Sequence, residues 1–328
     1  MSLLITLAAC GEKPAPAKTD SAGSTATSVM PALGPGEAML PVDGGKIWYE
    51  KSGTGTGTPA ILVHGGPGYS SYYLKSLEAL GDDRPVVRYD QLGGGKSTGL
   101  TDTTKMTIAH FVAELDSLRS ALGYDKFDLI GHSWGTMLGF EYYKAHPEHV
   151  ASLTLGSSAL DIPTWGRNTR KLVGTLSDSS QKAIHEAEAS KKYDSPAYKN
   201  AMNEFYGKYV WRHPVAADLD SMEKTVNEQI YNYMQGPSEF TITGTFQNFD
   251  VTGELKNVKV PVLYTVGEFD EADPATVKHF ASLTPGAKVV VIPGSAHVTT
   301  WDNPTAMTAA VRVFLRHVDS TSASAAKK

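Results

Sequence analysis

The sequence feature that most constrains the fold is a Gly-x-Ser-x-Gly pattern at residues 131–135. A short apolar run before it predicts a buried strand, and an apolar stretch that stops at Pro147 predicts a following helix. Strand, pattern and helix in this order indicate a nucleophile elbow, a tight turn that exposes Ser133 beside a helix N-terminus. Gly131 and Gly135 would leave room where a Cβ would clash. An ordinary Gly-Ser turn is the alternative interpretation.

The composition argues against several classes of protein. The 328 residues suffice for one large domain or for a domain with an insertion, and 41% hydrophobic with 20% charged residues is ordinary for a soluble globular chain. The formal net charge is -5 and no basic run occurs, which argues against binding to nucleic acid. Beyond the N-terminus, no segment approaches the ~18 apolar residues of a membrane span.

The N-terminal residues resemble a sorting signal. Leu-Ala-Ala-Cys at 7–10 is similar to the lipobox of bacterial lipoproteins, although no Lys or Arg precedes its apolar run, which is short. We interpret residues 1–10 as a truncated lipoprotein signal, which predicts lipidation of Cys10 and a periplasm-facing location in the cell envelope. A frayed apolar N-terminus on a cytoplasmic protein is the alternative. Residues 11–36, rich in Ala, Pro, Ser, Thr and Gly, are expected to form a disordered linker.

From about residue 37, strands alternate with helices. This rhythm predicts an α/β fold with a mainly parallel sheet and helices on both faces. Residues 159–252 lack the strand pattern and carry many aromatic residues, so we expect an inserted helical cap between two parts of the core, 37–158 and 253–318. A helix is predicted at about 107–122, and a final helix at about 304–317 would precede a loose polar tail at 319–328.

Two late loops supply partners for the serine. A serine becomes nucleophilic when a base takes its proton, and that base needs a carboxylate to orient it. Asp270 follows a predicted strand at 260–266, and His297 follows another at 288–292. Loops at the carboxyl ends of parallel strands carry functional groups, and His297 alone among the ten histidines occupies such a late loop. An early glycine-rich loop at 64–68 could complete an oxyanion hole, with a simple tight turn as its alternative.

No cofactor or metal is expected. Gly95-Lys96-Ser97 would need a glycine at the position of Asp90 to be a phosphate-binding loop. The spacing of His146 and His149 suggests metal ligands, but an intervening proline disfavours a helix that could present them.

Four motifs together resemble the proline iminopeptidase family of α/β-hydrolases. They are His-Gly-Gly-Pro-Gly at 64–68, Tyr-Asp-Gln-Leu-Gly-x-Gly-x-Ser at 89–97, Gly-His-Ser-Trp-Gly at 131–135 and Gly-Glu-Phe-Asp-Glu at 267–271. The similarity runs from about Glu37 to His317 and includes the cap. Leu92, where many members have Arg, is closer to the branch that contains the tricorn-interacting aminopeptidase. Thr136, where Gly or Ser is commoner, is a minor departure.

The resemblance implies an α/β-hydrolase fold and serine exopeptidase chemistry, with release of an N-terminal residue, often proline, from short peptides. It assigns Ser133 as nucleophile, His297 as general base and then acid, and Asp270 as the carboxylate that orients it. It further implies that the backbone N–H groups of Gly66 and Trp134 stabilise the oxyanion.

The resemblance also implies that Glu239, in the cap, and Glu271, next to Asp270, hold the free α-ammonium of the substrate. A cation taken from water needs paired anions, which would restrict cleavage to a free amino terminus. Without the resemblance, both residues would be interpreted as ordinary surface carboxylates.

Other functions remain open at this point. An amino-acid amidase, esterase or lactonase could use the same scaffold, so the expected substrate is a short peptide or an amino-acid amide. A non-catalytic ligand-binding lipoprotein is a remote alternative, because Ser133, Asp270 and His297 are all present. The only expected link to a membrane is the lipid at Cys10. The preferred N-terminal residue and the oligomeric state do not follow from the sequence.

Overall fold

The computed structural model describes residues 34–325. The predicted signal at 1–10, the lipidation site Cys10, residues 11–33 of the predicted linker and residues 326–328 lie outside the described residues. Within residues 34–325, every helix is too short or too polar to span a lipid bilayer.

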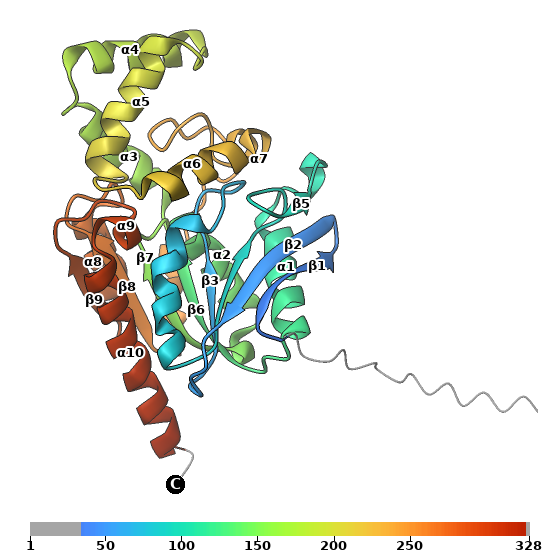
Figure 1. Cartoon of the computed structure of the whole chain (residues 1–328). Helices are drawn as coiled ribbons and strands as arrows, with labels where there is room; N and C mark the ends of the chain where they lie inside the picture. Colours follow the sequence, from blue (N-terminus) through green and yellow to red (C-terminus); the bar gives the residue numbers. More distant parts are fainter. Residues whose placement is uncertain (1–33, 326–328) are drawn as a thin grey trace, which may run out of the picture. The chain divides into compact units, whose positions relative to one another are not determined.

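The core of the described chain is a mixed sheet with strand order β1-β2-β4-β3-β6-β7-β8-β9 (Figure 1). Its six parallel strands are β3 (Ala60–Val63), β4 (Val86–Asp90), β6 (Phe127–His132), β7 (Val150–Gly156), β8 (Val262–Gly267) and β9 (Lys288–Ile292). Within this sheet, antiparallel pairing occurs only toward one edge, where β2 (Gly45–Ser52) pairs with β1 (Gly36–Val42), with β4 and with the short β5 (Thr98–Gly99). The predicted α/β fold with a mainly parallel sheet is confirmed.

Each central strand contributes side chains to two apolar layers, one on each face of the sheet. In β3, Ile61 and Val63 pack into one layer, and Ala60 and Leu62 pack into the other. The first layer is covered by α1 (Ile108–Ala121), α2 (Trp134–Ala145) and α8 (Pro274–Leu283). The second is covered by the 3-10 helix Tyr72–Asp82, α9 (Thr299–Asp302) and α10 (Pro304–Ala325). Both faces are therefore shielded from water, as parallel sheets require.

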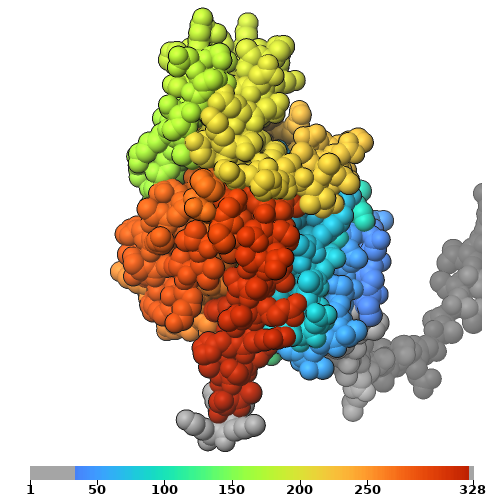
Figure 2. Space-filling view, turned by 60° about the vertical axis from the view of Figure 1, so that its left-hand side comes forward, coloured from blue at the N-terminus to red at the C-terminus, as the bar shows by residue number. Residues whose placement is uncertain are grey.

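Five helices lie between β7 and β8, and their local sequences explain where they begin. They are α3 (Ile162–Val173), α4 (Asp178–Ser190), α5 (Pro196–Tyr209), α6 (Ala216–Thr225) and α7 (Glu228–Met234). Side chains of Asp161, Ser177, Ser195 and Asn227 accept hydrogen bonds from the first turns of α3, α4, α5 and α7. Figure 2 shows this segment, coloured green to yellow, against the orange and red segments that follow β8.

The end of α5 connects this helical segment to the loops that follow β8 and β9. The carbonyl oxygen of Tyr209 accepts hydrogen bonds from the backbone N–H groups of Glu271 and His297, at 3.3 and 3.2 Å. The backbone N–H of Val298 donates to the oxygen of Val210 at 2.7 Å. Backbone contacts therefore join the helical segment to the two loops in which the sequence predicts site residues.

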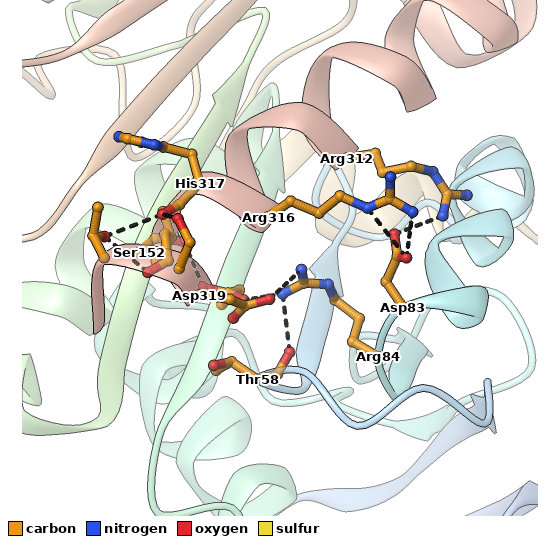
Figure 3. A network of polar contacts seen from close by, with 12 residues as sticks. Thr58, Asp83, Arg84, Ser152, Arg312, Arg316, His317 and Asp319 are labelled. Carbon is orange, nitrogen blue, oxygen red and sulfur yellow. Dashed lines mark hydrogen bonds and ion pairs between the residues drawn. The ribbon is translucent and has the colours of Figure 1, made fainter. Parts of the chain in front are cut away.

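The C-terminal residues overturn one prediction. Residues from Asp319 were expected to form a loose tail, but α10 continues to Ala325. Asp319 Oδ2 accepts a hydrogen bond from Arg84 Nη2 at 2.9 Å, and Figure 3 shows this guanidinium pointing toward α10. Arg84 is fully buried and also binds Asp128 at 2.7 Å. The polar composition was misleading because the partner of Asp319 lies 235 positions away in the sequence.

Candidate active site

The turn predicted at 131–135 is present, and Ser133 has the backbone angles φ 55° and ψ -125°. It immediately precedes the first turn of α2, at the carboxyl end of β6. A Cβ on Gly131 would lie 2.4 Å from the carbonyl oxygen of Gly135, and one on Gly135 would lie 2.2 Å from the oxygen of Val63. Only glycine fits at these two positions, so the sequence pattern reflects a steric requirement of the turn.

His297 and Asp270 form a hydrogen-bonded pair beside this turn. The His297 Nδ1–H donates to Asp270 Oδ1 at 2.9 Å, which leaves Nε2 of the ring able to accept a proton. The second carboxylate oxygen of Asp270 accepts from Ser157 Oγ at 2.6 Å and from the Gly267 N–H at 3.1 Å. Burial alone would raise the pKa of Asp270, but the nearby His297 and the hydrogen bonds from Ser157 and the Ala272 N–H hold this pKa below its usual value. The carboxylate is therefore ionised and fixed in orientation.

Ser133 and His297 line one cavity of about 50 Å³. Gly66 and Glu239 lie on its wall, and the same two residues and Ser133 also border an adjacent cavity of about 10 Å³. The ring of Trp165 packs edge-on against His297 with 5.4 Å between ring centres. His297 is only 4% exposed, so most water is excluded from its imidazole.

A series of hydrogen bonds supports the backbone of His297. The Gly65 N–H donates to the Tyr73 hydroxyl at 2.5 Å, and this hydroxyl donates to His132 Nδ1 at 2.9 Å, because the proton of the neutral His132 ring lies on Nε2. His132 Nε2–H then donates to the carbonyl oxygen of His297 at 2.9 Å. Burial lowers the pKa of His132 to about 3, and the nearby His297 contributes to this shift to a smaller extent. The ring therefore stays neutral. The neutral ring of His132 supports the backbone at His297.

The glycine-rich loop after β3 lies directly against the serine. A Cβ on Gly65 would come within 2.6 Å of Ser133 Cβ, and Gly66 adopts a positive φ of 56°. Trp134, the first residue of α2, borders the smaller cavity together with Gly66 and Ser133. The two backbone segments that carry the predicted oxyanion donors therefore meet at the serine.

Glu271 and Glu239 are two acidic residues without a cationic partner among the described residues. Glu271 is fully buried, and neither of its carboxylate oxygens has a hydrogen-bond partner in the described structure. Glu239 accepts hydrogen bonds from the Tyr231 hydroxyl at 2.7 Å and from Gln235 Nε2 at 3.2 Å. Burial raises the pKa of both groups, and the charges of Glu239 and Asp270 raise that of Glu271 further. Such a pair is costly unless a cation joins it.

Several supporting residues were not found from the sequence. Ser157, which binds Asp270, follows the carboxyl end of β7, so the rule that located His297 could have found it. Tyr73 and Tyr231 lie on helices with no motif around them, and nothing in the sequence signals their contacts. Among the described residues, no group of three or more His, Cys, Asp or Glu could hold a metal ion.

Comparison with known proteins gives consistent results. The family model described as alpha/beta hydrolase fold matches residues 58–304. A proline iminopeptidase of Heyndrickxia coagulans is 39% identical over 285 residues, which cover 86% of this chain and 99% of the relative. Two crystal structures are each 31% identical. That of VinJ has a TM-score of 0.82 and coverage of 86% and 98% of the two chains. That of the Mycobacterium smegmatis proline iminopeptidase has a TM-score of 0.78 and coverage of 87% and 99%.

Proposed function

Because this chain belongs to the proline iminopeptidase family of α/β-hydrolases, we propose that it releases the N-terminal residue from short peptides. The chain is a hydrolase of the prolyl aminopeptidase type, and we propose that the N-terminal residue it releases is proline or another small apolar residue. One observation carries this proposal: a buried, unpartnered Glu271 carboxylate beside Glu239, which lines the cavity of Ser133. That arrangement favours substrates with a free amine.

In the proposed reaction, Ser133 is the nucleophile. His297 Nε2 takes the proton from Ser133 Oγ as the oxygen attacks the substrate carbonyl carbon, and Asp270 stabilises the imidazolium that forms. His297 then donates this proton to the leaving amine as the C–N bond breaks, which leaves an acyl group on Ser133. A water molecule, deprotonated by the same imidazole, hydrolyses the acyl-enzyme and restores the serine hydroxyl.

The negative charge that develops on the carbonyl oxygen of the substrate needs hydrogen-bond donors directed at that oxygen. We assign this role to the backbone N–H groups of Gly66 and Trp134. The contact between Gly65 and Ser133 and the start of α2 at Trp134 support the assignment, because they bring both segments to the reacting oxygen.

The substrate's α-ammonium is the proposed cation for Glu239 and Glu271. In the free enzyme the two carboxyl groups repel each other, and burial favours their protonated forms. An ammonium between them would supply hydrogen-bond donors to Glu271 and compensate both charges. The pair would therefore select peptides with a free amino terminus and exclude blocked ones.

A panel of aminoacyl arylamides with free and acetylated amines tests this function. We expect the prolyl and alanyl arylamides to be cleaved, their N-acetyl forms to be inert, and the Ser133→Ala variant to have no activity. Equal rates on free and acetylated substrates would refute the amine anchor. Full activity of Ser133→Ala would refute the assignment of the nucleophile.

An amino-acid amidase, esterase or lactonase remains the alternative, because the same three side chains would serve it. The two glutamates favour aminoacyl substrates over lactones, which have no amine to pair with them. Faster turnover of esters or lactones than of free aminoacyl arylamides would support the alternative. A ligand-binding protein without catalytic activity would turn over none of them.

Lipidation of Cys10 and a location facing the periplasm stay predictions of the sequence. Intact-mass spectrometry of the protein from the expressing cell tests them. A diacylglyceryl mass on Cys10 is expected, and an unmodified thiol in the mature protein would contradict the prediction.

A further inference from the structure

The two proposed oxyanion donors come from separate segments of the chain. Gly66 lies in the loop after β3, whereas Trp134 begins α2 after β6. The parallel pairing of β3 and β6 aligns Val63 with Gly131, but β3 ends at Val63 and β6 continues only to His132. Oxyanion donors act only when they are held within a fraction of an ångström of the developing charge. Some contact beyond the sheet must therefore fix one segment relative to the other.

Besides the Tyr73 hydroxyl, which links Gly65 to His132, Gln91 makes such a contact with both ends of its side chain. It follows β4, the strand on the other side of β3, and is fully buried. Its Nε2 donates to the carbonyl oxygen of His64 at 2.9 Å, on the glycine-rich loop. Its Oε1 accepts from Trp134 Nε1 at 2.8 Å, on the elbow. One amide group thus bridges the two segments that carry the proposed donors.

Further contacts make each end of this bridge rigid. The backbone N–H of Gln91 donates to His64 Nε2 at 3.0 Å, so the ring carries its proton on Nδ1 and donates it to the Gly65 oxygen at 2.8 Å. On the other side, the indole of Trp134 stacks on Phe246, with 5.5 Å between ring centres and 14° between planes. Neither end can rotate without breaking a buried contact, so movement of Gln91 would move the donors.

We propose that Gln91 is a positioning residue that sets the spacing between the two oxyanion donors. This inference rests on the proposed oxyanion hole. Gln91 acts through the backbone of its neighbours, since it does not line either cavity at Ser133. Its loss should weaken binding of the tetrahedral transition state and leave binding of the ground-state amine unchanged, because the amine is held by Glu239 and Glu271.

Substitutions at both ends of the bridge test the proposal. Gln91→Met keeps the size of the side chain and removes its hydrogen bonds. Trp134→Phe removes the indole donor and part of the ring that packs on Phe246, and it leaves the backbone N–H in place. Thr284→Val is the matched control, because Thr284 is also buried, is hydrogen-bonded to Tyr264 at 2.8 Å and lines neither cavity. Each variant is assayed for kcat and KM with prolyl arylamide and for Tm.

Two inhibitors separate positioning from general damage. Pyrrolidine-2-boronic acid forms a tetrahedral adduct with a serine and reports on the oxyanion donors, whereas L-prolinol offers the amine without a carbonyl. We expect Gln91→Met to lower kcat by about 10- to 100-fold, with KM changed less than about threefold. The affinity for the boronic acid should fall by the same factor as kcat, and the affinity for prolinol should stay at the wild-type value.

The double variant of Gln91 and Trp134 adds a coupling measurement. If the two side chains act as one bridge, Gln91→Met with Trp134→Phe should be no slower than Gln91→Met alone. Wild-type kcat in Gln91→Met, with a Tm loss like that of Thr284→Val, would overturn the proposal, and so would equal loss of affinity for both inhibitors. Absence of turnover by the wild-type enzyme would instead refute the proposed function on which the inference rests.

Discussion

Replacement of Glu271 by glutamine is the most direct test of the amine anchor. The amide has the shape of the carboxyl group but cannot become an anion. Because burial and the charges of Glu239 and Asp270 already favour the protonated form of Glu271, the free enzyme should tolerate this change well. We expect its Tm to be at least that of the wild type, while its catalysis of free amines falls.

The expected loss in kcat/KM follows from the burial of Glu271. Truncation of one partner of a buried, hydrogen-bonded charge pair costs about 2–5 kcal/mol, which corresponds to a loss of about 30- to 5,000-fold. The ionisation of Glu271 that accompanies ammonium binding offsets part of this interaction energy, because the pKa of Glu271 is raised. The expected loss in kcat/KM at pH 7 is therefore near the lower end, roughly 30- to 100-fold.

The assay measures kcat/KM with prolyl arylamide for the wild type, Glu271→Gln and Glu268→Gln. Glu268 is a matched control in the same loop, because its exposed carboxylate only accepts the Gly294 N–H at 2.9 Å and an amide oxygen can replace it. We expect the control to stay within about twofold of the wild type.

Two results would show that the reasoning is wrong. Glu271→Gln with wild-type kcat/KM would mean that the buried carboxylate does not bind the amine. A large loss accompanied by a Tm that falls by many degrees would mean that Glu271 supports the fold instead of the substrate.

Three further predictions concern pH and stability. Because burial raises the pKa values of Glu239 and Glu271, both groups still lose protons above the pH range in which an ordinary glutamate ionises, so the KM for aminoacyl arylamides should fall as pH rises through that higher range, whereas an unchanged KM would contradict the anchor. Burial raises the pKa of Glu114 to about 8, so the native state keeps a proton that the unfolded chain has lost, and the free energy of unfolding decreases as pH rises from about 5 to 8. Urea denaturation should show that Glu114→Gln reduces this decrease, by roughly 2–4 kcal/mol; equal pH dependence in both proteins would refute it. Asp319→Asn should lower Tm by about 2–4 °C and increase amide exchange in residues 319–325, because it weakens the ion pair with Arg84; unchanged exchange there would contradict the role of this pair.

The sequence by itself determined the fold class and singled out the residues that we propose for the site. These depend on local patterns: the period of apolar residues distinguishes strand from helix, and glycine marks the turns where a Cβ does not fit. The helix α1 illustrates this, since Thr107 caps its N-terminus and Gly123, with φ 70°, follows its C-terminus. Ser133, Asp270 and His297 could be proposed from the sequence because each follows a strand, and the carboxyl ends of these parallel strands meet at the same edge of the sheet.

Other features were decided only by tertiary structure. β1 could not be predicted because Leu40 is its one buried residue, and the strand exists through its pairing with β2. The last turns of α10 depend on Asp319 and Arg84, which are distant in the sequence.

The buried charges and hydrogen bonds of the candidate site were also decided by tertiary structure. Glu271 looks like an ordinary surface carboxylate in the sequence, and its unpartnered burial arises when the end of α5 closes over the loop after β8. Gln91 likewise bridges two segments only because β4, β3 and β6 lie side by side. The period of apolar residues along the sequence indicates which face of a helix or strand is apolar. Which polar groups share a buried space depends on how distant segments pack, and a single sequence does not record that packing.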